Sequence, residues 1–250
     1  MNKSINRIIT LTSRNIKELI REPLSLIFTF ALPLVMEVLF YYIFHSLTPQ
    51  FEMKYLAPGI VIFSQAFLTL FVGLVISLDR SSAFLTRLFV TKTKPIEFII
   101  SYALSVVPFA VIQSILFFFV GVIIEPSIFS VNIILCILLS LVTSIFFIGT
   151  GILFGCICNE KSIGGISSIV ITGQSVLSGM WFPLDGLDGG IITFMNCLPF
   201  KNAVDLLQNT LNGIVDPFKD FVLPLLIVLA YSLVVIIIAV VAFKNKMKEK

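Results

Sequence analysis

The chain has 250 residues, of which 58% are hydrophobic and only 12% are charged. Soluble domains average roughly 25% charged residues, so this composition excludes an ordinary water-soluble fold and indicates that lipid is part of the solvent. The net charge of +3 is small. No basic patch with interleaved aromatic residues is present, so nucleic acid is not expected as a partner.

Residues 3–22 are predicted to form an amphipathic helix. Ile5, Ile8, Ile16 and Leu19 follow helical spacing along one side. Another face carries the cations Lys3, Arg7, Arg14, Lys17 and Arg21. Such a helix can lie in the headgroup layer of a membrane with its cations near anionic lipid, whereas the alternative is a soluble helix packed on a partner protein.

Six later segments have the roughly 20 mostly apolar residues that a helix needs to cross a bilayer. They are Leu24–Leu47, Leu56–Leu78, Phe98–Ile124, Val131–Ile157, Ile163–Trp181 and Phe221–Phe243. Pro33 and Pro108 lie inside spans and are expected to kink them, which a helix bundle tolerates. Strand-type alternation is absent, so we predict an all-α, polytopic membrane protein with a single transmembrane domain over residues 1–250.

Lys and Arg are concentrated on one predicted side of the membrane. The N-terminal segment has five, residues 79–97 have four, and the C-terminal tail has four. Lys161 lies in a short turn on the same side, and only Lys54, Lys201 and Lys219 lie on the other. Because Lys and Arg accumulate in cytoplasmic loops, we predict a multi-pass protein of the cell membrane with both termini and residues 79–97 in the cytoplasm.

Residues 79–97 form a charged island between two apolar spans. Its charged residues are Asp79, Arg80, Arg87, Lys92, Lys94 and Glu97. A short helix is predicted here, capped by Ser81 or Ser82. Its apolar pairs at i,i+4 spacing are Phe84/Leu88 and Leu85/Phe89. A plain loop does not need exposed Phe and Leu, so docking on another protein is favoured over a loop folded against its own bundle.

Residues 178–213 precede the last span on the predicted outer side. This stretch has aromatic residues, prolines and several glycines, and it is too apolar for an ordinary solvated loop. We predict that residues 182–213 form re-entrant helices that dip into the outer leaflet and pack on protein. Trp181 at the boundary is also typical of an interfacial anchor.

No nucleotide-binding or catalytic motif is found. The P-loop pattern G-x-x-x-x-G-K-[ST] is absent. The chain has one histidine, His45, and its four cysteines lack C-x-x-C spacing, so a metal site is not expected. Gly151-x-x-x-Gly155 is interpreted as a close helix–helix contact. We therefore expect a chain without enzyme activity and without a cofactor of its own.

Four polar side chains lie inside the predicted spans. Glu37 is in the first span and should face the bundle, a cavity or a partner, because a carboxylate in lipid is costly. One alternative is that Glu37 lines a transport route or responds to protonation. The other is that it forms a hydrogen bond to a neighbouring helix, which could belong to a second subunit of a dimer. The other three are the amides Gln65, Gln113 and Gln174. We interpret them as side chains that form hydrogen bonds between helices, although several of them facing inward would form a polar lane.

The order of these parts resembles the ABC-2 family of ABC-transporter permeases, over essentially the whole chain. The family has a motif after the second span, and the residues that match it are Asp79, Leu85, Arg87, Leu88, Thr91 and Glu97. The departures are Ala83-Phe84 in place of Gly-Thr, Thr86 in place of an acid, and Lys92 in place of Pro. A second, outer motif is matched by Gly179, Phe182, Pro183, Leu198 and Pro199, while Asp188 stands where a further Pro is common.

The resemblance implies six transmembrane helices, with residues 81–92 as a coupling helix seated in a separate ATPase subunit. The implied contact residues are Ser82, Phe84, Leu85, Arg87, Leu88, Phe89 and Thr91. Residues 3–22 would be a connecting helix beside that subunit, through Arg14, Lys17, Glu18 and Arg21. Two permeases, identical or merely similar, would pair with two ATPases, which would bind the ATP and Mg.

The function implied is export of an amphipathic or hydrophobic substrate, such as a drug, an antimicrobial or cytolytic peptide, or a lipid-linked molecule. The alternative is a secondary transporter or channel that uses Glu37 as an intramembrane proton or cation site. An enzyme acting on lipids is disfavoured by the missing catalytic cluster.

Overall fold

The computed structural model describes residues 3–82, 94–182 and 187–248. Its α-helices are α1 (Lys3–Ile20), α2 (Pro23–Leu26), α3 (Leu32–Phe44), α4 (Met53–Ser81), α6 (Pro95–Ile124), α7 (Asn132–Ile157), α8 (Glu160–Leu177), α9 (Gly189–Cys197), α10 (Pro199–Asn212) and α11 (Leu223–Lys248). Two π-helical turns, Ile27–Ala31 and Pro217–Val222, and two 3₁₀ turns, Pro49–Phe51 and Pro126–Ile128, join them. These ranges contain no strand, so the predicted all-α class is confirmed.

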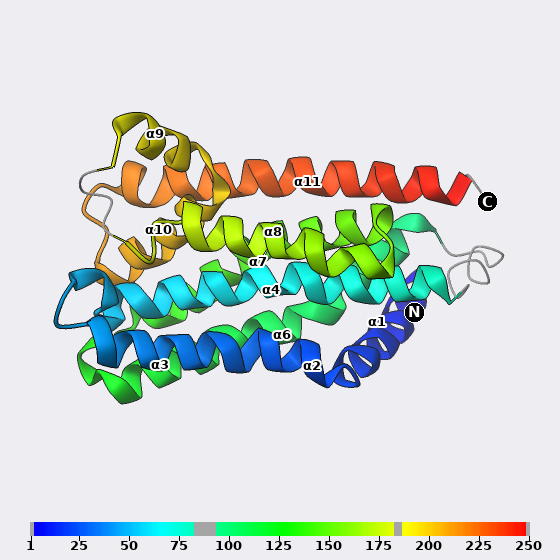
Figure 1. Ribbon diagram of the computed structural model, residues 1–250. Coiled ribbons are helices and arrows are strands. Elements are labelled where there is room, and N and C mark those ends of the chain that lie inside the picture. Colours follow the sequence, from blue (N-terminus) through cyan, green and yellow to red (C-terminus); the bar gives the residue numbers. More distant parts are fainter. Residues whose placement is uncertain (1–2, 83–93, 183–186, 249–250) are drawn as a thin grey trace.

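The long helices run side by side, and α1 crosses one end of the bundle (Figure 1). At this end α4 finishes and α6 begins, so we call it the island end. The short helices α9 and α10 cover the opposite end, which we call the capped end. The first and last described residues both lie at the island end, as expected if the two termini share one side of a membrane.

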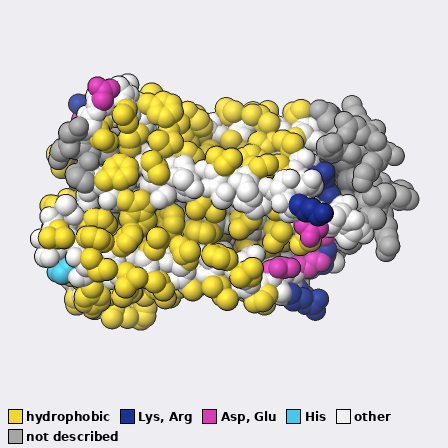
Figure 2. Space-filling view, viewed as in Figure 1, with side chains coloured by type: hydrophobic (Ala, Val, Ile, Leu, Met, Phe, Trp, Pro, Cys, Tyr) yellow, Lys and Arg dark blue, Asp and Glu magenta, His cyan; other side chains and the backbone are white. Residues whose placement is uncertain are grey.

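Five helical segments in the described ranges are long and apolar enough to cross a membrane. They are Pro23–Phe44, Met53–Ser81, Ile96–Ile124, Asn132–Ile157 and Pro217–Lys244. Between the two ends the visible surface is almost wholly hydrophobic or uncharged (Figure 2). A surface of this kind suits lipid rather than water, which supports a polytopic membrane protein.

The fifth predicted span, Ile163–Trp181, is the segment that differs most from expectation. Its helix, α8, runs from Glu160 to Leu177, so the helix ends before the expected boundary at Trp181. Gly179 has φ 72, a left-handed conformation that L side chains disfavour, and the chain therefore turns just after the helix. α8 is rich in Gly, Ser and Thr, and it does not belong to the five apolar segments. A sixth crossing helix stays a prediction.

The centre of the bundle is the contact between α4 and α7. α4 is 89% buried over its most apolar window, whereas the first and last candidate spans are 17% buried. A Cβ added at Gly151 would lie 2.6 Å from the Thr69 carbonyl oxygen, and one at Gly155 would lie 2.7 Å from the Ile76 Cβ. The predicted close contact at Gly151 and Gly155 is therefore confirmed, since only glycine lets the two helices approach this closely.

Candidate functional site

The candidate site is a cluster of charged residues at the island end, built on the two helix ends that flank residues 83–93. Asp79 lies in the last turn of α4 and is almost fully buried. The Arg14 guanidinium donates from Nη1 to Oδ2 and from Nη2 to Oδ1 of this carboxylate, both at 2.5 Å. Tyr102 of α6 donates its hydroxyl to Oδ2 at 2.6 Å. A two-pronged arginine contact fixes geometry as well as charge, so it holds α1 firmly against α4.

Glu97 forms the matching contact on the other side of the island, in the first turn of α6. Its side chain is 4% exposed. Oε2 accepts the Lys94 backbone N–H at 3.2 Å, which caps the helix start, and Arg7 lies 3.3 Å away. The Ser4 hydroxyl donates to Oε1. An acidic residue in a first turn also suits the positive end of the helix dipole.

Both contacts come from one helix. Arg7 and Arg14 are seven residues apart in α1, which is close to two helical turns, so they share a side of it. Arg14 reaches the carboxylate before the island and Arg7 reaches the one after it. α1 is therefore bonded to both flanks of residues 83–93.

Electrostatics within the cluster depend on burial. The pKa of the Glu18 carboxyl is raised, first by burial and then by the nearby Asp79 carboxylate, although Arg14 opposes both. Burial works to lower the pKa of Arg14, but its hydrogen bond and charge interaction with Asp79 outweigh this, and the pKa lies above its usual value. Removing one member of such a buried pair typically costs about 3–5 kcal/mol, because the other charge is left without compensation.

The same end of α4 is attached to the turn between α7 and α8. Arg80 donates to the backbone carbonyl oxygens of Gly155 at 2.8 Å and Cys158 at 2.9 Å. Ser81 lies 3.3 Å from the Glu160 carboxylate. Arg80 thus satisfies carbonyl groups at the end of α7. The island is therefore flanked by a helix end that contacts α1, α6, α7 and α8.

The coupling residues expected from the sequence fall mostly outside this description. Ser82 is the C-cap of α4, and its hydroxyl donates to the Asp79 carbonyl oxygen at 3.3 Å. The others, Phe84, Leu85, Arg87, Leu88, Phe89 and Thr91, lie outside the described residues. Of the connecting-helix residues, Arg14 and Glu18 form an ion pair with each other, while Lys17 and Arg21 are exposed.

The polar residues of the spans lie at separate helix contacts. Gln65 of α4 donates to the Ser140 carbonyl oxygen of α7 at 2.7 Å. Gln113 of α6 donates to the carbonyl oxygens of Thr29 and Ser64, both at 3.1 Å. Gln174 is fully buried in α8, and its amide has no hydrogen-bond partner among the described residues. No described hydrogen bond joins these amides into a continuous lane.

Glu37 is fully buried on α3. A Cβ added at Gly121 of α6 would lie 3.6 Å from Oε1, which places the carboxyl group between α3 and α6 of the same chain. Within the described part of the chain, neither carboxyl oxygen has a hydrogen-bond partner. The same ranges hold no group of three His, Cys, Asp or Glu residues that could bind a metal ion.

The outer motif lies at the capped end. Gly179 forms the turn after α8, and the Phe182 carbonyl oxygen accepts from Gln50 at 2.7 Å. Leu198 is the N-cap of α10 and Pro199 its first residue, where a missing N–H costs nothing. Pro183 lies outside the described residues.

An aromatic pocket of about 470 Å³ lies beside this motif. It is lined by Met36, Phe40, Phe44, Phe51, Ser175 and Trp181. The Trp181 ring packs edge-on against Phe40, with centroids 4.7 Å apart, and its N–H donates to the Ser175 hydroxyl at 2.7 Å. Such a pocket can hold apolar groups of a ligand and offers one hydroxyl for orientation.

Sequence reasoning identified Asp79 and Glu97 but not their partners on α1. The residues of each pair are 65 and 90 positions apart, so no local spacing links them.

The chain matches the sequence model of a known protein family. The model described as ABC-2 type transporter aligns with residues 6–212, which is most of the chain. A comparison with individual curated proteins returns no match.

Proposed function

The chain belongs to the ABC-2 type transporter family, and from that premise we propose that it is the permease subunit of an ATP-driven exporter. In this proposal a separate ATPase subunit acts on residues 81–92. The ATPase binds the ATP and Mg, since this chain has no P-loop. A second permease, identical or similar, completes the membrane path.

The observation on which the proposal rests is the double attachment of α1 to the flanks of the island. Asp79 and Glu97 stand on either side of residues 83–93, and each is bonded to α1. A force applied to the island therefore reaches α4, α6 and α1 together rather than one loop alone. Charge-assisted contacts of this kind are short-ranged and directional, which suits them to transmit a displacement.

α4 is the element best placed to carry that displacement across the bundle. It is the most buried of the candidate spans, and it contacts α7 through the closely packed glycines Gly151 and Gly155. Close-packed helices move as rigid units between discrete arrangements because their interiors do not deform continuously. Two ATPase states that bind the island differently would thus bias two arrangements of the spans.

An amphipathic or hydrophobic cargo is proposed from the aromatic pocket at the capped end. Four of its six lining residues are aromatic, and a single hydroxyl, that of Ser175, adds a polar contact. A drug, an antimicrobial or cytolytic peptide, or a lipid-linked molecule has the apolar surface that such a pocket would cover. The outward direction is taken from the family resemblance.

The competing function is a secondary transporter or channel in which Glu37 binds a proton or cation. It is favoured by one observation, the fully buried carboxyl group without a described hydrogen-bond partner. The proposal of an ATP-driven exporter is preferred because the chain belongs to the ABC-2 type transporter family.

The test is co-purification and reconstitution with the Leu88→Asp variant. The wild-type chain should retain a vanadate-sensitive ATPase whose hydrolysis is stimulated by peptides or drugs from a panel. Leu88→Asp should abolish this stimulation while the chain still inserts into the membrane, because a charge is placed on the apolar docking side.

Leu47→Asp is the matched control, since Leu47 is an exposed leucine in the turn after α3, away from the island. It should leave stimulation unchanged. Unchanged stimulation and transport in Leu88→Asp, or the absence of any ATPase from the purified wild type, would contradict the proposal.

A further inference from the structure

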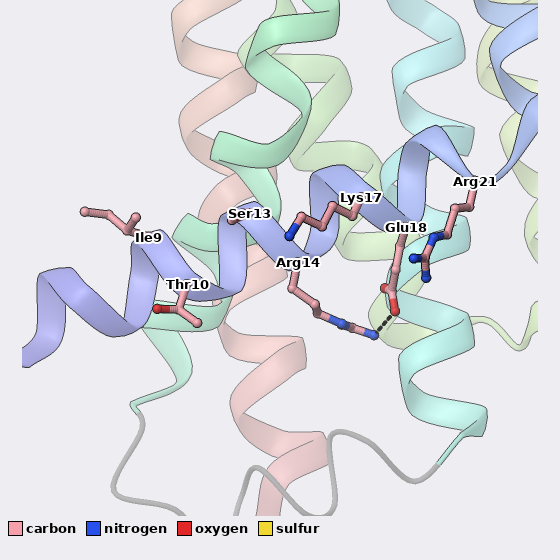
Figure 3. Close-up of a pocket in the computed structure, with 7 residues that line it drawn as sticks. All are labelled: Ile9, Thr10, Ser13, Arg14, Lys17, Glu18 and Arg21. Carbon is pink, nitrogen blue, oxygen red and sulfur yellow. Dashed lines mark hydrogen bonds and ion pairs between the residues drawn. The ribbon is translucent and has the colours of Figure 1, made fainter.

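Two neighbouring grooves lie on the exposed side of α1. The first, of about 500 Å³, is lined chiefly by the polar residues Thr10, Ser13, Arg14, Lys17, Glu18 and Arg21 (Figure 3). The second, of about 370 Å³, is formed between α1 and α6 and is lined chiefly by Ile8, Ile9, Thr12, Ile16 and Leu104. The grooves share Ile9, Ser13 and Lys17, so a single molecule can occupy both.

The polar groove carries an excess of positive charge. It contains three cations, Arg14, Lys17 and Arg21, and one carboxylate, Glu18. Arg14 is engaged with Asp79 and Glu18, and the Arg14–Glu18 pair is drawn in Figure 3. Lys17 and Arg21 are exposed and take part in none of the described ion pairs, although the charge of Arg21 also acts on the Glu18 carboxylate. Both cations thus present exposed charge to an anion from outside the chain.

The second groove has the opposite character. Ile9 and Leu104 are about half exposed, and Ile16, which is partly buried, lines the same groove. Leu104 belongs to the α6 segment that is apolar enough to lie in lipid. Exposed apolar side chains along such a groove are suited to cover a hydrocarbon chain.

We propose that these grooves form a seat for one anionic phospholipid. Its phosphate lies on Lys17 and Arg21, and one acyl chain lies along Ile16 and Leu104. A soluble phosphate would leave the apolar groove uncovered, and a neutral lipid would leave the two cations without a counter-charge. Because α1 is also bonded to Asp79 and Glu97, a lipid in this seat would fix the position of α1 relative to both flanks of residues 83–93. The seat does not depend on the proposed transport function.

The seat can be tested with the delipidated full-length chain in neutral detergent and fluorescent phosphatidylglycerol. Binding should be tighter than that of fluorescent phosphatidylcholine. Lys17→Ala and Arg21→Ala should each weaken phosphatidylglycerol binding roughly fivefold, and about thirtyfold together, because each cation near a headgroup contributes to a similar degree. Lys219→Ala removes an exposed cation at the capped end and should change nothing.

A second variant separates a defined seat from diffuse charge attraction. Ser13→Trp fills the junction of the two grooves without changing charge, and Ser13 is exposed, so folding should be retained. It should weaken binding of phosphatidylglycerol at least as much as losing one cation. Wild-type affinity for phosphatidylglycerol in Ser13→Trp would contradict the seat. Equal affinity of the wild-type chain for phosphatidylglycerol and phosphatidylcholine would also contradict it, as would soluble glycerol phosphate displacing the fluorescent lipid as well as unlabelled phosphatidylglycerol does.

Discussion

The two ends of the bundle are built from different chemistry. At the island end, buried carboxylates on α4 and α6 are bonded to arginines of α1 over distances of 2.5–3.3 Å. At the capped end, α10 buries an apolar face and aromatic rings surround an open pocket. On the face shown in Figure 2, most charged side chains lie near the island end. Directional ion pairs fix the relative position of helices, whereas aromatic surfaces adapt to varied ligands, so the ends suit different tasks.

The largest effect on stability is expected when the ion pair between Arg14 and Asp79 at the island end is removed. Arg14→Ala leaves the buried Asp79 carboxylate without its guanidinium partner, and the free energy of unfolding should fall by about 3–5 kcal/mol. The measurement is unfolding in mixed micelles as the fraction of denaturing detergent is raised. Lys219→Ala, which removes an exposed cation at the capped end, should change stability by less than about 0.5 kcal/mol.

The double variant Arg14→Ala/Asp79→Ala sharpens this prediction. Removing both partners leaves no buried carboxylate at position 79 without its counter-charge, although the partly exposed Glu18 loses a partner. The double variant should therefore be more stable than Arg14→Ala alone. If the loss of unfolding free energy in the double variant equalled the sum of the losses in Arg14→Ala and Asp79→Ala, the two side chains would not interact.

The connection between the two ends should be the next most sensitive feature. In Gly151→Ala the new Cβ would meet the Thr69 backbone, which cannot move aside, so a loss of about 1–3 kcal/mol is expected. Gly164→Ala in α8 is the matched control, because nothing lies within 4 Å of its added Cβ. That control should be neutral or more stable by about 0.5–1 kcal/mol, since alanine favours helix. Equal stability of the two variants would contradict a close α4–α7 contact.

At the capped end, Trp181→Ala should weaken binding of the cargo more than it weakens coupling to the ATPase subunit. It removes the ring that packs on Phe40, and such aromatic contacts contribute about 0.5–1.5 kcal/mol each. The cargo concentration that half-maximally stimulates ATP hydrolysis should rise several-fold, while recovery of the ATPase with the permease stays unchanged. Loss of the ATPase from the purified complex would instead place the coupling function at this end.

The smallest effect is expected at Glu37. Glu37→Gln keeps the side-chain shape and removes only the ionisable group, so ATP-driven transport should persist within about twofold, and stability within about 0.5 kcal/mol. Transport by reconstituted vesicles is the measurement. Complete loss with the ATPase still bound would favour the secondary transporter or channel.

The helices were predictable from the sequence because long apolar runs have few alternatives to a membrane helix. Five of the six predicted spans coincide with the five apolar helical segments, although their ends differ by a few residues. The end of α8 was not predictable, since Ser178–Trp181 is apolar enough to continue a span and only the backbone of Gly179 shows the turn. Gly151 and Gly155 were predictable because their spacing repeats along one helix face.

The candidate site was predictable only in part. Asp79 and Glu97 stood out as acids beside apolar spans, but hydrophobic periodicity does not say which distant cation each one meets. Arg7 and Arg14 could be assigned to a polar face of α1, and that assignment favoured a membrane surface over a partner protein without indicating either carboxylate. Their contacts depend on how α1 crosses the bundle, which is set by tertiary packing of residues such as Leu19 and Phe98.

The most direct test of the account is photo-crosslinking from the island. A photoreactive amino acid placed at Leu88 in the membrane-embedded chain should crosslink to a nucleotide-hydrolysing subunit, and one placed at the exposed Val215 of the capped end should not. Crosslinks from Leu88 that reach only the chain's own helices, with the ATPase captured nowhere or only from Val215, would contradict the account.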